Sequence, residues 1–357
     1  MKWLNPLSPA GHSNGGYTLE RPLGGGGTGN VWLARCSEGR FEGRVVVRLL
    51  NRGLPGEDGV AGLQREASEL ARLAHRNIAD FIEMGVDADR PYLVLEYVEG
   101  EPIDRWCDVH RLGVAARIRL FLQVLEGVSH AHGRMILHRD LKPSNVLVTA
   151  EGVVKLLGFG IAKLLDGAGR TAPRGDLTAA LTPDYAAPEQ VLRTELTPAT
   201  DVYALGVMLY VLLTGKHPTA NDASTPFERL RALAERDPAP ASEAARSTRP
   251  FLAPALRGDL DTILAKALEK SLLERYTTVA AFAEDLQRYL EQQPGSGGRD
   301  ARSALDLTVT LASAFEDVPQ RVVRFVARVL EHRLVATQEM RFAAPRLRVP
   351  GRVVDHE

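Results

Sequence analysis

The sequence predicts an α+β protein of two lobes, a small antiparallel β-sheet lobe followed by a larger and mainly helical lobe. Residues 17–97 contain short runs of β-branched and aromatic residues bounded by glycine and proline, which is typical of strands. From about Arg105 onward, apolar residues recur at the spacing of one helix face. We therefore divide the main domain, residues 17–293, into lobes of residues 17–97 and 98–293.

The first lobe is expected to hold a sheet and one main helix. Its strand-like runs are YTLERPL, NVWLARC, RVVVRLL and PYLVLEYV. Between the last two runs, LQREASELARLA places Leu63, Leu70 and Leu73 near the helical period, which predicts the helix.

The second lobe is expected to surround one buried helix. The stretch DVYALGVMLYVLLTG is apolar on nearly every side, as is typical of a helix enclosed by other elements. Three further stretches predict helices that are apolar along one face: GVAARIRLFLQVLEGVSHAHGRM, DLDTILAKALEK and TVAAFAEDLQRYLEQQ.

The segments that flank the main domain have a different composition. Residues 1–16 are rich in Gly, Pro, Ser and Asn and predict a flexible lead-in, and residues 294–300 (PGSGGRD) predict a linker. Residues 301–357 predict a helical extension, in which VPQRVVRFVARVLEHRL has a valine stripe and an arginine stripe. This basic amphipathic helix either packs on the main domain or docks a partner or an anionic surface.

Composition excludes several classes of protein. The 44 Lys and Arg residues balance 45 Asp and Glu, so the net charge of -1 gives no indication of nucleic-acid binding. Cys36 and Cys107 are too few for a disulfide framework. No apolar leader and no transmembrane run of about 18 apolar residues are present, so we expect a cytoplasmic protein.

A glycine cluster lies between the first two strand-like runs. Gly24, Gly26 and Gly29 fit the pattern G-x-G-x-x-G, and Val31 follows. The next residues, VWLARC, predict a strand, whereas a dinucleotide-binding unit would begin a helix there. A glycine hairpin can bring its backbone N–H groups close to phosphates because no Cβ blocks the approach.

The stretch ILHRDLKPSNVLV concentrates reactive side chains in one loop. Within six positions it has a carboxylate, Asp140, an ammonium group, Lys142, and an amide, Asn145. Phosphoryl transfer needs a carboxylate to orient a hydroxyl, a cation to balance phosphate charge and an oxygen ligand for a divalent ion.

These motifs resemble the protein kinases, and specifically the serine/threonine kinases of bacteria, over about residues 17–293. HRDLKPSN has the serine/threonine form, YAAPEQ supplies Glu189, DVYALGV supplies a buried Asp201, and Arg275 falls where the family places the partner of Glu189. The resemblance implies the bilobal kinase fold, catalytic roles for Asp140, Lys142 and Asn145, and use of ATP with magnesium.

One departure from the family lies in KLLGFG. Gly158 occupies the place of the family's metal-binding aspartate, while Phe159 keeps its position and can pack inward. Asn145 remains as one metal ligand. ATP is therefore a candidate cofactor, whereas magnesium binding is doubtful.

A second departure lies in RVVVRLL. Arg48 stands where the family has the lysine that pairs with a helical glutamate, here Glu66 or, as the weaker candidate, Glu69. The wide guanidinium fork substitutes poorly for a compact ammonium group at a phosphate. The arginine at position 48 could reflect only the arginine-rich composition of the chain. Lys142 argues against that explanation, because it remains a lysine in the same composition.

The adenine pocket implied by the resemblance shows a third departure. Val46 stands where the family has a small alanine, which narrows the pocket. The resemblance places Leu95 as gatekeeper, the backbone of Glu96 and Val98 at the adenine edge, and Leu147 as the floor. Ordinary core packing explains the four apolar positions of this pocket equally well.

The segment from Gly160 to Glu189 has a regulatory pattern. Thr171 and Thr178 are candidate phosphorylation sites, and Arg139 is the residue type that pairs with such a phosphate. Thr182 matches the threonine that touches the catalytic aspartate in the family.

Two functions follow from these observations. The changes at Arg48 and Gly158 indicate a pseudokinase that binds a protein partner, with nucleotide as a second candidate ligand, whereas the intact loop from His138 to Asn145 indicates an active kinase with protein substrates. A phosphotransferase for non-protein substrates is the remaining alternative.

Overall fold

The computed structural model describes residues 13–14, 16–26, 29–36, 43–50, 64, 67–87, 90–159, 183–192, 194–221 and 225–292. The chain divides into two compact units, residues 1–292 and 293–357, and every described residue belongs to the first. The linker 294–300 and the extension 301–357 with its basic helix lie outside the described residues, as do four residues of the predicted site: Glu66, Thr171, Thr178 and Thr182. The domain boundaries drawn from the sequence stay predictions.

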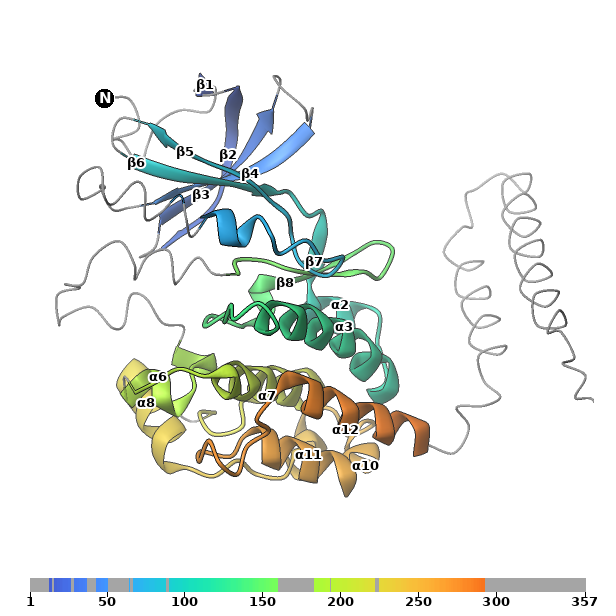
Figure 1. Cartoon of the computed structure of the whole chain (residues 1–357). Helices are drawn as coiled ribbons and strands as arrows, with labels where there is room; N and C mark the ends of the chain where they lie inside the picture. The colour runs from blue at the N-terminus through green and yellow to red at the C-terminus, as the bar shows by residue number, and fades with distance from the viewer. Residues whose placement is uncertain are drawn as a thin grey trace, which may run out of the picture. The chain divides into compact units, whose positions relative to one another are not determined.

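The small lobe is a six-stranded antiparallel sheet with the strand order β1-β2-β3-β4-β6-β5 (Figure 1). Its strands are β1 (Ser13–Asn14), β2 (Tyr17–Gly26), β3 (Gly29–Cys36), β4 (Gly43–Leu50), β5 (Phe81–Asp87) and β6 (Arg90–Glu96). The antiparallel sheet predicted from the four strand-like runs is confirmed. Strand β5, FIEMGVD, was missed because its glutamate and glycine weaken the strand pattern.

Part of the predicted helix of the small lobe lies within the described residues. Residues 67–70 are helical, and the Ala71 N–H group donates to the Ala67 carbonyl at 3.0 Å. Ala67, Leu70 and Leu73 are buried, so the apolar side of this segment packs inward, as the spacing of its leucines predicts.

The two faces of the sheet have different neighbours. On one face, Val45 and Val47 of β4 join a core that belongs to the small lobe alone. Leu50 belongs instead to the core that continues into the large lobe. Because alternate side chains of a strand point to the same side, Val46 and Arg48 share the face of Leu50 and project toward the large lobe.

The large lobe is mainly helical and includes a second, three-stranded sheet (Figure 1). The sheet consists of β7 (Gly100–Pro102), β8 (Val146–Thr149) and β9 (Val154–Leu156). The helices are α2 (Ile103–Val109), α3 (Val114–His132), α6 (Pro188–Leu192), α7 (Pro198–Thr214), α8 (Pro226–Glu235), α9 (Ala241–Ala244), α10 (Ala253–Leu256), α11 (Asp259–Ala267) and α12 (Val279–Gln292). Among the described residues, no helix is long and apolar enough to cross a membrane.

Helix α7 is the buried helix that the sequence predicts. Fifteen of its 17 residues are buried. A capping box between Thr197 and Thr200 begins the helix, and Gly215, at φ +72°, ends it in the left-handed conformation that glycine adopts without strain. A central helix with defined ends can hold loops at either end in fixed positions.

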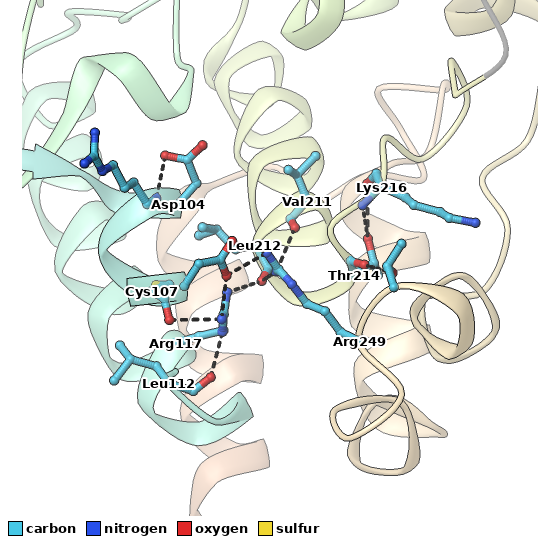
Figure 2. A network of polar contacts seen from close by, with 12 residues as sticks. Asp104, Cys107, Leu112, Arg117, Val211, Leu212, Thr214, Lys216 and Arg249 are labelled. Carbon is cyan, nitrogen blue, oxygen red and sulfur yellow. Dashed lines mark hydrogen bonds and ion pairs between the residues drawn. The ribbon is translucent and has the colours of Figure 1, made fainter. Parts of the chain in front are cut away.

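Two arginines cap the C-terminal end of α7 (Figure 2). Arg117 of α3, only 1% exposed, donates from Nη1 to the Leu212 carbonyl at 2.7 Å, and Arg249 also donates to that carbonyl. The Asp108 carboxylate accepts from both, at 2.8 Å from Arg117 and 2.7 Å from Arg249. Positive charge is favourable at this end of a helix, because the last carbonyls have no partner within it.

Replacing Arg249 tests this cap. The substitution Arg249→Met removes hydrogen bonds to Leu212 and Asp108, and we expect it to lower the free energy of unfolding by about 2 kcal/mol. Urea unfolding of this variant beside Arg257→Met, which alters an exposed arginine, provides the measurement. Equal midpoints for the two variants would show that Arg249 contributes nothing to stability.

Candidate active site

A buried carboxylate, that of Asp201, binds the backbone of the loop that follows α3. Asp201, in the first turn of α7, accepts the backbone N–H groups of His138 at 2.8 Å and Arg139 at 2.9 Å, and lies 2.7 Å from Nε2 of His132. Burial alone would raise the pKa of Asp201, but its hydrogen bond with His132 and the nearby imidazoles lower that pKa below its ordinary value. The carboxylate therefore stays charged, and the buried Asp201 expected from the sequence is confirmed.

His138 joins this loop to the segment that contains the glycine substitution. Its side chain is 1% exposed, and its Nε2 lies 3.0 Å from the Leu157 carbonyl. Its ring packs edge-on against the Phe159 ring, with the two ring centroids 4.6 Å apart. Phe159 is 6% exposed and packs in the main core, as expected. Burial lowers the pKa of His138, against the opposing effect of the Asp201 and Asp140 carboxylates.

The lowered pKa of His138 predicts a loss of stability in mild acid. The unfolded chain takes up a proton at the ordinary histidine pKa of about 6.5, while buried His138 resists protonation, so stability is full above that pH and falls below it. In His138→Phe, the slope of unfolding free energy against pH between 6 and 5 should fall by up to about 1.4 kcal/mol per pH unit. Urea unfolding over this range measures it; an unchanged slope would contradict the assignment.

The three reactive side chains of the loop lie together. Lys142 Nζ lies 2.9 Å from Asp140 Oδ2. Asn145 donates from Nδ2 to the Asp140 carbonyl at 2.8 Å and to Oδ2 at 3.1 Å. The Asn145 carbonyl accepts the Leu157 N–H at 2.8 Å, which ties the loop to the residue before Gly158. A carboxylate flanked by an ammonium group and an amide is suited to orient a hydroxyl beside a phosphate.

Gly158 leaves an open place beside this group. It lies just after β9, with φ +84°, in the left-handed region. Apart from Gly158 and its two chain neighbours, no described residue has an atom within 4 Å of the position that a Cβ would take. The backbone therefore bends as the motif requires, but no side chain replaces the family's aspartate.

The glycine hairpin joins β2 to β3, and β3 pairs with β4, the strand that contains Arg48. Gly26 pairs with Gly29 at the end of the β2–β3 hairpin, and a Cβ on Gly29 would lie 2.0 Å from the Leu49 carbonyl oxygen. A side chain is therefore excluded at Gly29. Val31 pairs in turn with Arg48 of β4, which places the arginine directly beside the hairpin.

Arg48 lies within the electrostatic reach of the loop that contains Asp140. Its side chain projects from the sheet face that turns toward the large lobe. Burial lowers the pKa of its guanidinium, and the Asp140 carboxylate opposes that shift. The predicted partner Glu66 lies outside the described residues, and the weaker candidate, Glu69, is exposed. Residue spacing does not predict the electrostatic effect of Asp140 on Arg48.

The residues predicted to line an adenine pocket are grouped by strand register. Val46 and Leu95 are direct partners on β4 and β6. Leu147 on β8 is opposite Lys155 on β9, and Lys155 Nζ lies 3.0 Å from Glu96 Oε2. Val98, just after β6, is buried. This grouping is compatible with the pocket, and the binding roles stay predictions.

The Lys155–Glu96 ion pair was missed by the sequence analysis. Glu96 also accepts the Asp80 N–H through the same carboxylate oxygen, at 2.9 Å. The ion pair therefore connects the last residue of β6 with β9. One signal was available: only seven of the 44 cationic residues are lysines, and Lys155 is among them.

Helix α6 is anchored to both the loop and the rest of the large lobe. Glu189 and Arg275 form the expected buried ion pair, with Nη1 and Oε1 2.8 Å apart. Gln190 donates to the Arg139 carbonyl at 2.8 Å. Residues 160–182, with the candidate threonines, lie outside the described residues, so the regulatory role of Arg139 stays a prediction.

Comparisons with known proteins agree with this geometry. Residues 17–286 match the family model of the protein kinase domain. Serine/threonine-protein kinase Pkn1 of Myxococcus xanthus is 34% identical over 85% of this chain and 43% of its own length. Serine/threonine-protein kinase PknB of Mycobacterium tuberculosis is 31% identical over 81% of this chain and 45% of its own length. The chain thus spans less than half the length of these two relatives.

Solved structures show the same fold. A variant of the PknI kinase domain of Mycobacterium tuberculosis superposes with a TM-score of 0.56 at 24% identity, covering 79% of this chain and 98% of that one. Its likeness extends over both lobes and confirms the predicted bilobal architecture. The chain belongs to the protein kinase family, among the bacterial serine/threonine kinases of the Hanks type.

Proposed function

We propose that this chain is a pseudokinase, which transfers phosphate poorly or not at all and acts in signalling by binding a protein partner. The observation that carries the proposal is Gly158. The family's metal-binding carboxylate is missing there, and no described atom has moved into the open place.

The poor fit of the site to magnesium supports this proposal. Magnesium prefers oxygen ligands in a nearly octahedral arrangement. The described residues offer the side-chain oxygen of Asn145 and the Asp140 carboxylate, whose Oδ2 is already engaged by Lys142 and Asn145. Within the described part of the chain, no three His, Cys, Asp or Glu side chains are grouped to hold a metal. These residues do not fit the family's metal site.

The expected loss of rate is large. Neutralisation of phosphate charge by a metal contributes several kcal/mol to the transition state. A loss of about 4 kcal/mol corresponds to roughly a thousandfold in rate. Arg48 adds a further loss at the same phosphates, although changes acting on shared groups are not additive.

An active serine/threonine kinase is the second candidate. The arrangement of Asp140, Lys142 and Asn145 favours it, because their mutual distances suit a base and a phosphate-balancing cation. In that case ATP is the phosphate donor and a protein hydroxyl the acceptor. The basic helix that the sequence predicts within residues 301–357 is the proposed docking element in either case.

Transfer of labelled γ-phosphate from Mg-ATP to the chain itself and to a basic protein substrate separates the two candidates. The control is Asp140→Asn, which removes the predicted base. For a pseudokinase, the natural chain and the control give equal signals. Transfer that disappears in the control would establish an active kinase.

A further inference from the structure

Two histidines from distant parts of the chain meet near the end of α3. The ring of His75, in the segment before β5, and the ring of His130 in α3 have their centroids 4.6 Å apart. His75 Nδ1 accepts the Asn77 N–H at 3.2 Å. His130 Nδ1 lies 3.3 Å from the Nη1 donor of Arg134, and its covered Nε2 has no hydrogen-bond partner among the described residues. Because both Nδ1 atoms act as acceptors, each ring carries its one proton on Nε2 and is neutral.

The charged groups around this pair of rings are mostly cations. Burial lowers the pKa of His75 and of His130. The Arg134 guanidinium and the neighbouring imidazole lower the pKa of His130 further. The charged groups that act on His75 are one carboxylate, which raises its pKa, and three cations, which lower it: Glu126, Arg76, Arg134 and Lys155. A proton added to either ring therefore meets more positive than negative charge.

Two of these cations are available to a partner. Lys155 is already engaged, because its Nζ lies 3.0 Å from Glu96 Oε2. Arg76 and Arg134 are exposed, and neither forms an ion pair with another described residue. Glu126, which is also exposed, offsets one of the two arginines. The surface thus has a small excess of positive charge while the rings are neutral, and this excess grows with each proton that a ring takes up.

An exposed methionine follows Arg134 in the chain. Met135 is 90% exposed and has φ +61°, in the left-handed region that residues other than glycine rarely adopt. Its N–H donates to the His132 carbonyl at 2.9 Å, which fixes the turn after α3. A methionine side chain is flexible and polarisable, and it adapts to partners of different shape. The turn therefore presents an apolar contact beside a cation.

We propose that these residues form a docking surface for an acidic segment of a protein partner, which binds with uptake of a proton by the imidazole pair. The surface, called the imidazole surface below, consists of His75, Arg76, His130, Arg134 and Met135. Two exposed arginines are too few for a nucleic-acid backbone or a lipid surface, which proteins bind through larger basic clusters.

The inference rests on the proposed function, because it takes the partner to be a protein, and it deepens that function by naming the chemistry of the partner. A carboxylate placed against an imidazole favours the charged form of the ring. The bound state therefore holds more protons than the free state, and acid strengthens the binding.

Fluorescence anisotropy with the full chain and a labelled synthetic peptide tests the inference. The peptide consists of Glu and Asp with one central Leu, and its control has Gln and Asn in their place. The acidic peptide should bind, and its binding should tighten between about pH 7.5 and 6 by up to about tenfold per pH unit for each proton taken up. The peptide carboxylates stay ionised over this range, because their ordinary pKa is about 4. The control peptide should not bind.

Variants of the chain locate the binding. Arg134→Met removes an exposed cation and should weaken binding about two- to fivefold at either pH. His130→Gln keeps a neutral polar group, so binding near pH 7.5 should be retained and part of the tightening in acid lost, which a purely structural role of the histidine would not cause. Arg257→Met alters an exposed arginine between α10 and α11 and should bind as the natural chain does.

A second measurement uses the natural chain alone. The NMR titration of the His130 ring should shift to higher pH when the acidic peptide is bound. This measurement decides the question even if His130→Gln does not fold, which thermal unfolding without peptide reveals.

Any of four results would overturn the inference: no binding of the acidic peptide, binding that does not change with pH, binding unchanged in folded Arg134→Met, or tighter binding to phosphatidylserine vesicles or a single-stranded oligonucleotide than to the peptide. Failure of the proposed function is a different result, namely transfer of labelled γ-phosphate by the natural chain.

Discussion

The double variant Arg48→Lys with Gly158→Asp is expected to transfer phosphate from Mg-ATP about a thousandfold faster than the natural chain. The remaining parts are in place, since Asp140, Lys142 and Asn145 are already grouped within hydrogen-bonding distance. The new aspartate restores the metal ligand, and the lysine restores a compact ammonium group at the phosphates.

The backbone tolerates this repair. Gly158 has φ +84°, which costs most residues about 1–2 kcal/mol, but aspartate adopts this region more readily than most. No described atom obstructs its Cβ.

Initial rates with labelled ATP measure the gain, with each single variant and the triple variant with Asp140→Asn beside the double. The gain should vanish in the triple variant. A double variant that folds, binds Mg-ATP and stays inactive would show that another departure, such as Val46, silences the site.

Arg275→Met is expected to lower the free energy of unfolding by about 3–5 kcal/mol. Arg275 is 2% exposed, and it donates to Glu189 and, at 2.7 Å, to the Ala199 carbonyl. Methionine fills much of the volume but leaves the 4%-exposed Glu189 carboxylate buried without its cation. A buried charge without compensation is far more costly than a lost surface pair.

Urea unfolding of Arg275→Met beside Arg231→Met provides the comparison. Arg231 pairs with Glu235 on exposed α8, where side chains are 66% and 59% accessible, so its loss should cost no more than about 1 kcal/mol. Glu189→Gln combined with Arg275→Met should recover part of the loss. Similar midpoints for the two single variants would mean that the buried pair is not a source of stability.

The sequence predicted the fold because its local signals agree with the tertiary structure. The nearly uniform apolar character of residues 201–215 corresponds to a helix whose surroundings are protein on almost every side. The glycine hairpin was identified by the strand that follows it, and the Asp140 loop by residue types at fixed spacing. In each case a short stretch contains the whole pattern.

Features that depend on two distant stretches were not predicted. The interaction of Arg48 with Asp140 joins strand and loop positions 92 residues apart, and the Lys155–Glu96 pair joins positions 59 residues apart. The arginine cap on α7 depends on how α2, α3 and the residues around Arg249 meet. Such pairings follow from packing, which residue spacing does not reveal.

The hold of Asp201 on the loop has an evolutionary consequence. Asp201 accepts hydrogen bonds from the backbone N–H groups of His138 and Arg139. Almost any residue at those two positions would have such an N–H group. The shape of the loop is therefore encoded largely in α7, apart from the side chains that face a nucleotide. A substitution at position 158 can therefore change the chemistry of the site while these two backbone hydrogen bonds are kept. In evolution, loss of phosphate transfer and loss of the fold are thus separate events for this architecture.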